Sequence, residues 1–171
     1  MRNLYLVGFM AAGKTSAGTA LARRLDRRFV DLDEVLAARF GVTIAEVFAS
    51  LGEPAFRTAE REAVRETGRL DRAVVAVGGG AFCDPANREI MHEHGCSVFL
   101  DVAWAALAER LAADHDGRPR FRGLADAERL YRQRRPHYLA ATWTVALEGP
   151  ETPADVAGLV AEAVSGAACA T

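Results

Sequence analysis

The segment from residue 4 to residue 15 restricts the possible folds more than any other part of the chain. Residues 4–7 form a continuous apolar run with aromatic and β-branched character, which is typical of a strand buried on both faces in a parallel sheet. From Ala17 onward, apolar residues recur at helical spacing. Between the two patterns, Gly8 to Thr15 read Gly-x-x-x-x-Gly-Lys-Thr. The motif therefore lies on a strand-to-helix turn.

This spacing of glycines and lysine has a chemical meaning. A loop of this shape turns successive backbone N–H groups inward at the positive end of the following helix, where a polyphosphate binds. Lys14 can reach the β- and γ-phosphates, and the Thr15 hydroxyl can bind Mg²⁺. The alternative is a plain strand–turn–helix with a chance lysine, which roughly one chain in a hundred of this length would contain. We favour the phosphate-binding interpretation, which predicts a nucleotide but no particular reaction.

The whole chain narrows the class of protein further. Its 171 residues, half of them hydrophobic, predict one domain with a sizeable core. The net charge of −2 gives no electrostatic argument for a nucleic-acid or membrane partner, and no apolar stretch approaches the roughly 20 residues that span a bilayer. A strand that begins within three residues leaves no room for a signal peptide.

Three cysteines without paired spacing favour reduced thiols and a cytoplasmic location. Residues 166–171 are small and weakly patterned, so we expect a frayed tail.

Strand-like apolar runs alternate with helical patterns along the chain. The runs lie near residues 4–8, 28–33, 73–80, 97–101 and 142–147. This alternation predicts an α/β fold with three layers, in which helices cover both faces of a five-stranded parallel sheet. Ligands bind such sheets beyond the carboxyl ends of the strands.

Two aspartates follow the second predicted strand. Asp31 and Asp33 are two residues apart, so on an extended chain they point the same way. Paired carboxylates resist ionisation unless a cation is near. One could therefore hold Mg²⁺, and the other could accept a proton from an attacking hydroxyl. The alternative is that one of them caps the helix that follows; beside the phosphate loop we favour the functional role.

Two further patterns suggest a binding site for an acidic substrate. Arg57 and Glu60 are helical neighbours. They form either a surface ion pair or a pair in which Glu60 holds the Arg57 guanidinium ready for a carboxylate. Gly78, Gly79 and Gly80 are costly in conformational entropy, so we favour a close approach of the backbone to a ligand over a simple turn.

The region from residue 114 to residue 123 is polar, charged and rich in helix breakers. This composition is typical of a mobile flap or of a solvated linker. In a flap, the arginines at 118, 120 and 122 could bring positive charge to a transferring phosphoryl group. Arg134 lies near a helix end before Pro136, with several competing cations around it.

The ordered set "DLD", "GE..FR..E", "GGGAF", "RP" and "R.PHY" resembles shikimate kinase from about residue 3 to about residue 165. That family belongs to the nucleoside-monophosphate-kinase-like type of P-loop NTPase fold. The resemblance implies one kinase domain over 1–171, with a substrate-binding helical segment near 32–68 and a lid near 113–124. It also implies a monomer that uses ATP and Mg²⁺ to phosphorylate the 3-hydroxyl of shikimate, giving 3-phosphoshikimate and ADP in aromatic amino acid biosynthesis.

The resemblance also assigns roles to individual residues. The ATP–Mg²⁺ loop comprises Gly8, Ala11, Ala12, Gly13, Lys14 and Thr15. Asp31 corresponds to the magnesium-side aspartate, and Asp33 to the proposed base that binds the shikimate hydroxyls. Arg57 and Arg134 correspond to the pair that grips the shikimate carboxylate, and Gly79 to a backbone contact to the sugar-like ring; with Asp33 and Glu60 they make up the expected substrate site. Arg118 corresponds to the lid arginine at the phosphates and Arg110 to an arginine against adenine, so the implied catalytic residues are Lys14, Asp33 and Arg118.

The chain departs from the family pattern at three places. Ala11 replaces a loop glycine, Arg120 and Phe121 replace leucines after the lid proline, and Ala146 replaces an aspartate near the adenine. Two rival hypotheses therefore stay open. One is another P-loop small-molecule kinase, acting on gluconate or a nucleotide, and the other is a nucleotide-binding regulatory module without turnover.

Overall fold

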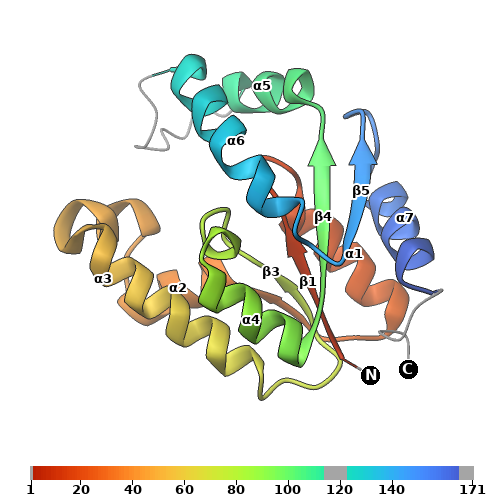
Figure 1. The fold of residues 1–171 in the computed structure, drawn as a ribbon, viewed down its shortest axis with the longest axis horizontal. Coiled ribbons are helices and arrows are strands. Elements are labelled where there is room, and N and C mark those ends of the chain that lie inside the picture. The colour runs from red at the N-terminus through yellow and green to blue at the C-terminus, as the bar shows by residue number, and fades with distance from the viewer. Residues whose placement is uncertain (1, 114–122, 166–171) are drawn as a thin grey trace.

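The computed structural model describes residues 2–113 and 123–165. The predicted tail and most of the predicted lid, including Arg118, Arg120, Phe121 and Arg122, lie outside the described residues. Five parallel strands form one sheet in the order β2-β3-β1-β4-β5 (Figure 1). The strands are β1 (Asn3–Val7), β2 (Phe29–Asp31), β3 (Val74–Ala76), β4 (Gly95–Val102) and β5 (Trp143–Leu147). The prediction of a five-stranded parallel α/β fold is confirmed.

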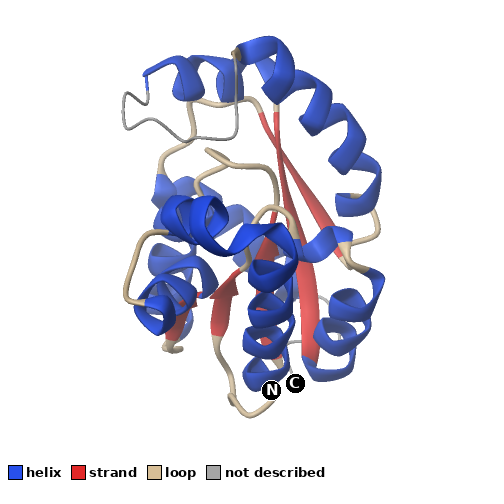
Figure 2. Cartoon of the chain, turned by 90° about the vertical axis from the view of Figure 1, so that its left-hand side faces the viewer, coloured by secondary structure: helices blue, strands red, loops and turns tan. Residues whose placement is uncertain are grey.

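Helices cover both faces of this sheet. They are α1 (Lys14–Leu25), α2 (Leu32–Phe40), α3 (Ile44–Thr67), α4 (Pro85–His94), α5 (Trp104–Ala113), α6 (Leu124–Tyr138) and α7 (Pro153–Ser165), with a short 3₁₀ helix η1 (Ala81–Cys83). Helices α1 and α7 pack together on one face, and α4 lies on the other, as Figure 1 shows. Seen after a quarter turn, the strands run between these helical layers (Figure 2).

The central strand β1 brings the predicted site residues to one edge of the sheet. All five of its residues are at most 1% exposed, because β3 and β4 flank it and helices cover it. In the parallel register, Leu6 lies beside Ala76 of β3. The segments that follow β1, β2 and β3 therefore leave the sheet on the same side, where parallel sheets bind ligands.

Local signals set the helix starts near this edge. Gly13, with φ of 82°, begins α1 in a left-handed conformation that suits glycine. The Asp31 carboxylate accepts a hydrogen bond from the Asp33 amide at 2.9 Å and caps α2. The helix-cap alternative for Asp31 is therefore correct, and the cap shortens β2 to three residues.

Helix α3 has two parts. Gly52 has φ of 77° and ψ of 170°, and Pro54 follows it, so the helical path breaks there. The part before the break starts with a capping box in which Thr43 and Glu46 satisfy each other's backbone N–H groups. The part after the break carries Arg57 and Glu60 towards the sheet edge.

The sequence predicted no membrane-spanning stretch and reduced cysteines. Within residues 2–113 and 123–165, no single helix is both long and apolar enough to cross a membrane; α2 and α3 meet that test only together, with a bend of 85° between them.

Cys83 has a free thiol, as expected. Cys96 is disulfide-bonded, so the expectation of reduced thiols is wrong for Cys96.

Gly95 offers a test of how closely β4 packs on β1. A Cβ atom at this position would lie 2.2 Å from the Asn3 carbonyl oxygen and 2.8 Å from the Tyr5 ring. We therefore expect Gly95→Ala to lower the free energy of unfolding by about 1–3 kcal/mol, measured by urea denaturation. Gly158→Ala in α7 is the matched control. No atom lies within 4 Å of its added Cβ, so stability should rise by about 0.5–1 kcal/mol. An unchanged urea midpoint for Gly95→Ala would contradict this packing.

Candidate active site

The phosphate loop connects β1 to α1 and has the backbone geometry that its glycines require. Gly8 has φ of 151°, and a Cβ there would lie 3.0 Å from the Leu100 carbonyl oxygen. Ala11 also has a positive φ, of 60°. That conformation costs a non-glycine residue about 1–2 kcal/mol. This cost is a physical reason for the glycine that the family pattern has at the position of Ala11.

Lys14, the first residue of α1, folds back over the loop. Its Nζ atom donates to the carbonyl oxygens of Gly8 at 3.1 Å and of Phe9 at 3.0 Å. The ammonium group is therefore held at the mouth of the loop, next to the start of α1. Ala12 is only 4% exposed, and its amide donates to Phe9 within the loop at 3.3 Å.

Thr15 and Asp31 bring two hard oxygen atoms together. The Thr15 hydroxyl donates to Oδ2 of Asp31 at 2.6 Å, while Oδ1 of the same carboxylate caps α2. Asp31 thus caps α2 with one carboxylate oxygen and meets the Thr15 hydroxyl with the other. A hydroxyl and a carboxylate are the ligands that Mg²⁺ takes from a protein when phosphates and water supply the rest.

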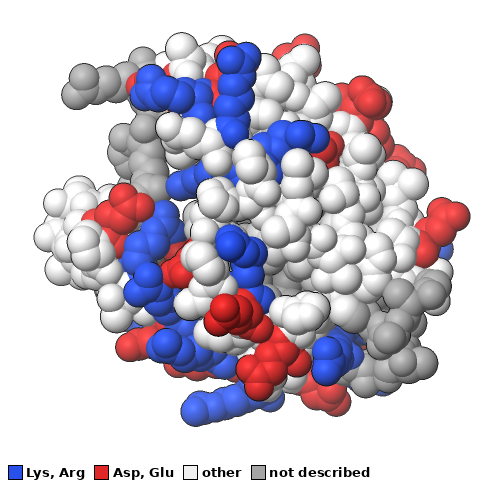
Figure 3. Space-filling model, in the orientation of Figure 1, with Lys and Arg blue, Asp and Glu red and all other residues white. Residues whose placement is uncertain are grey.

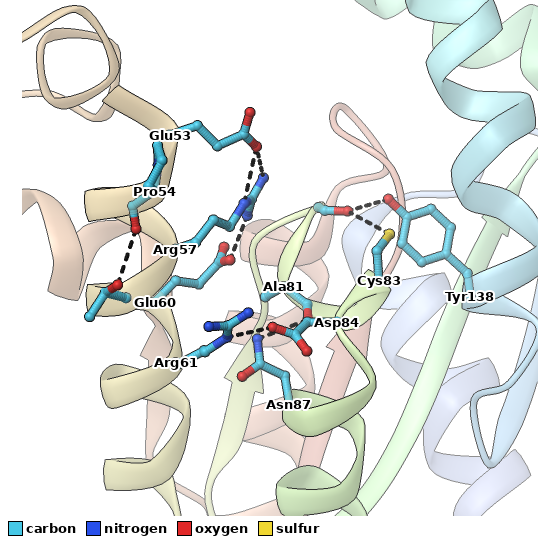
Figure 4. A network of polar contacts seen from close by, with 12 residues as sticks. Glu53, Pro54, Arg57, Glu60, Arg61, Ala81, Cys83, Asp84, Asn87 and Tyr138 are labelled. Carbon is cyan, nitrogen blue, oxygen red and sulfur yellow. Dashed lines mark hydrogen bonds and ion pairs between the residues drawn. The ribbon is translucent and has the colours of Figure 1, made fainter. Parts of the chain in front are cut away.

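Arg57 is held by two glutamates, as Figure 4 shows. Its Nη1 atom donates to Oε2 of Glu60 at 2.5 Å, and its Nη2 atom donates to Oε1 of Glu53 at 3.0 Å. The Glu60 side chain is 3% exposed and that of Arg57 is 21% exposed. The pair is therefore largely buried and not a solvated surface ion pair.

Burial and charge act against each other in this pair. Burial raises the pKa of the Glu60 carboxyl, and the charge of Arg57 offsets this only in part. Burial alone would lower the pKa of Arg57, but Glu60 and Glu53 outweigh it and raise that pKa above its ordinary value. Arg57 is therefore a fixed positive charge, and Glu53 is a partner that sequence reasoning missed.

The glycine triplet after β3 leaves room for charged side chains. A Cβ on Gly78 would lie 2.7 Å from Oδ1 of Asp33 and 3.2 Å from Oε1 of Glu60. A Cβ on Gly80 would lie 2.5 Å from the Arg57 guanidinium. A side chain at Gly78 or Gly80 would therefore displace the charged groups of Asp33 or Arg57 from their present positions, a packing reason that the sequence did not reveal.

Arg134 reaches the same place from α6. Its Nη1 atom lies 3.7 Å from the position that a Cβ of Gly79 would take. The competing cations of this helix have acidic partners: Arg129 pairs with Asp126, Arg132 with Glu128, and Arg135 with Asp101.

One cavity of about 790 Å³ collects most of the predicted site. Figure 3 shows Lys and Arg side chains gathered on the face where α3 and α6 oppose each other. Gly8 and Ala12 belong to the loop but do not line this cavity. The predicted residues that line it are Ala11, Gly13, Lys14, Thr15, Asp31, Asp33, Arg57, Glu60, Gly79, Arg110 and Arg134.

Arg110 ties the phosphate loop to the segment after β5. Its Nη1 atom donates to the Ala11 carbonyl at 3.0 Å, and its Nη2 atom donates to the Gly149 carbonyl at 2.7 Å. The guanidinium plane is thereby fixed along the cavity wall. Ala146 lies in β5 opposite Asp101 of β4 and does not line this cavity.

The cavity also has an apolar wall that sequence reasoning missed. The wall consists of Ile44, Ala45, Phe48 and Phe56 from α3, and the two phenylalanine rings are 4.5 Å apart. Their helical spacing was visible in the sequence, but the same spacing also describes a helix that faces the core.

Comparison with known proteins agrees with this geometry. A model of the shikimate kinase family matches residues 10–165. A shikimate kinase from Salinibacter ruber is 37% identical over 95% of this chain and 84% of its own length. The solved shikimate kinase from Acinetobacter baumannii, in complex with shikimate, has a TM-score of 0.89 at 31% identity, covering 98% of this chain and 96% of the other.

A gluconokinase from Sinorhizobium meliloti has a TM-score of 0.55 at 15% identity, covering 96% of this chain and 94% of its own, so it shares the fold alone. The family match spans nearly the whole chain, and the predicted motifs meet in one cavity. The chain therefore belongs to the shikimate kinase family.

Proposed function

We propose that this chain transfers the γ-phosphoryl group of ATP to the 3-hydroxyl of shikimate, giving 3-phosphoshikimate and ADP. The observation that carries the proposal is the shared cavity, in which Lys14 and Asp33 lie together with Arg57 and Arg134. A polyphosphate site and a carboxylate site that open into one space suit transfer between ATP and an acidic alcohol.

The ATP end of the cavity is formed by the phosphate loop and the start of α1. Backbone N–H groups and the helix dipole favour polyphosphate there. Lys14 neutralises phosphate oxygens once it exchanges its contacts with the Gly8 and Phe9 carbonyls for phosphate. Arg110 is proposed to flank the adenine, and Arg118 to approach the phosphates from the lid.

The donor set also fits Mg²⁺. Thr15 and Asp31 would hold the ion, and bound Mg²⁺ supplies charge that offsets the β- and γ-phosphate oxygens. Within the described part of the chain, no group of three or more His, Cys, Asp or Glu side chains could hold a metal ion. One carboxylate and one hydroxyl agree with the usual Mg²⁺ site, where substrate phosphates and water complete the shell.

The acceptor end is formed by the two arginines and Asp33. Arg57, fixed by Glu60 and Glu53, is proposed to bind the shikimate carboxylate together with Arg134. Gly79 would contribute backbone contacts to the ring. Asp33 would orient the 3-hydroxyl and accept its proton, while the phenylalanine wall would exclude water that could hydrolyse ATP.

The remaining expectations are proposals as well. We place substrate recognition in the helical segment 32–68 and closure of the site in the lid near 113–124, within one domain. We propose that the protein acts as a cytoplasmic monomer, with small molecules as its substrates.

An acceptor panel tests the function against both rival hypotheses. ADP release from ATP is measured with shikimate, gluconate, nucleoside monophosphates or no acceptor. We expect release that depends on shikimate alone. Turnover of another acceptor without turnover of shikimate would favour the other kinase hypothesis. Binding of ATP and shikimate without ADP would favour the regulatory module.

Thr15→Ala tests the magnesium proposal. Loss of the hydroxyl removes one metal ligand, so the Mg²⁺ concentration for half-maximal turnover should rise roughly tenfold or more. Thr19→Ala is the matched control, because the Thr19 hydroxyl donates to the Thr15 carbonyl one turn along α1, at 2.9 Å, and does not line the cavity. Removal of divalent cations with EDTA should abolish turnover in all three proteins. An unchanged Mg²⁺ requirement in Thr15→Ala would exclude Thr15 as a ligand.

A further inference from the structure

Tyr138, the last residue of α6, joins the two arginine-bearing sides of the cavity without lining it. The side chain is fully buried, and its ring lies 5.2 Å from that of Phe99 in β4. Its hydroxyl donates a hydrogen bond to the Gly79 carbonyl (Figure 4). The position that a Cβ of Gly79 would take is 3.6 Å from this hydroxyl and 3.7 Å from Nη1 of Arg134, one helical turn earlier.

The turn after β3 needs such an anchor because three glycines restrict the backbone very little. Side chains of α4 hold the later carbonyls of this turn: Asn87 bonds Ala81 at 3.0 Å, and Arg88 bonds Phe82 at 2.9 Å. The Gly79 carbonyl lies earlier, within the triplet itself. Besides Tyr138, it has a weak contact from the Cys83 sulfur at 3.9 Å.

We propose that the Tyr138 hydroxyl is a positioning group for the acceptor: it fixes the peptide between Gly79 and Gly80 in register with Arg134. The described peptide bonds include no cis bond. In a trans peptide the C=O and N–H groups point in opposite directions. A Gly79 carbonyl held by Tyr138 therefore turns the Gly80 N–H away from Tyr138, towards the cavity that Gly80 lines. The inference rests on the proposed binding of shikimate between Arg57 and Arg134.

The hydroxyl is suited to this role because it stays protonated. Burial raises the pKa of Tyr138 well above its ordinary value, and the nearby Cys83 adds to this, while Arg134 and Arg57 oppose it. The group therefore remains a hydrogen-bond donor at every pH at which the enzyme is assayed. Tyr138, Cys83, Arg134 and Arg57 all lie near the glycine triplet. The hydrogen bond from Tyr138 to Gly79 therefore belongs to the acceptor side of the cavity.

Tyr138→Phe removes this hydroxyl alone and leaves the ring packing in place. It leaves the part-buried Gly79 carbonyl without its main partner, so the backbone of the triplet loses its fixed orientation. We expect the KM for shikimate to rise roughly five- to fiftyfold, with the KM for ATP changed less than about twofold.

Tyr5→Phe is the matched control for a purely structural effect. Tyr5 is also fully buried, and its hydroxyl bonds that of Thr67 at 2.9 Å, outside the cavity lining. Both variants should lose similar thermal stability, but Tyr5→Phe should keep the shikimate KM of the wild type. An unchanged shikimate KM in Tyr138→Phe, or equal shifts in both variants, overturns the proposal.

Hydrogen exchange supplies a second readout that does not depend on the variant folding. In the wild type, shikimate should slow exchange of the Gly80 amide. Absence of this protection, with shikimate bound, overturns the proposal. Failure of the proposed function is recognised separately, because then the wild type and Tyr5→Phe would not release ADP with shikimate at all.

Discussion

Asp33→Asn should lower kcat for shikimate phosphorylation by roughly 10²–10⁴-fold and leave the affinity for ATP almost unchanged. Asp33 lies in the first turn of α2 and lines the cavity, with Oδ1 directed to the glycine triplet. Asparagine has the same shape but cannot accept a proton at neutral pH. The backbone amide that caps α2 through Asp31 is retained, so the fold should not change.

The matched control is Glu34→Gln, which removes the same charge from the next, exposed position of α2. Both variants are compared by steady-state ADP release and by ATP titration. Glu34→Gln should behave as the wild type. Wild-type kcat in Asp33→Asn would remove Asp33 from the chemistry, and a parallel loss of ATP affinity would indicate a disturbed phosphate loop instead.

Arg57→Ala should raise the KM for shikimate by roughly 30- to 5,000-fold, equivalent to about 2–5 kcal/mol. The variant removes a cation from the acceptor end and leaves Glu60, whose side chain is 3% exposed, without its main counter-charge. Because burial already raises the pKa of Glu60, loss of Arg57 should raise that pKa further. The acceptor end would also lack one of the two guanidinium groups proposed to hold the substrate carboxylate, so the kinase would bind its anionic substrate poorly.

Arg61→Ala is the matched control on the same helix. Arg61 forms an ion pair of 2.6 Å with Asp84 but does not line the cavity. Its loss should lower stability slightly and leave the shikimate KM unchanged. The decisive measurement is the ratio of the two KM values for shikimate, with the KM for ATP recorded for both. Equal shikimate KM values would refute the carboxylate-binding role of Arg57.

The sequence by itself determined the sheet, the phosphate loop and the helix starts. Each of these depends on residues that are close along the chain. A continuous apolar run indicates a buried strand, Gly13 permits the left-handed turn before α1, and Asp31 caps α2 through a contact two residues away. The five strands followed from such local signals, and so did the position of Lys14 at the turn.

The tertiary structure alone decided which charged residues share the cavity. In sequence, Arg134 looks like its neighbours Arg129, Arg132 and Arg135. Arg129 and Arg132 pair with acidic residues of their own helix, but only the fold brings Arg135 to Asp101 of β4 and Arg134 to Gly79. Glu53 lies four residues before Arg57 on the same helix, so its support of Arg57 could have been found from that spacing. The apolar wall of α3 and the bond from Tyr138 to Gly79 were hidden, as was the place of Arg134. These hidden features depend on how helices and strands pack, and local periodicity carries no information about the partner across such an interface.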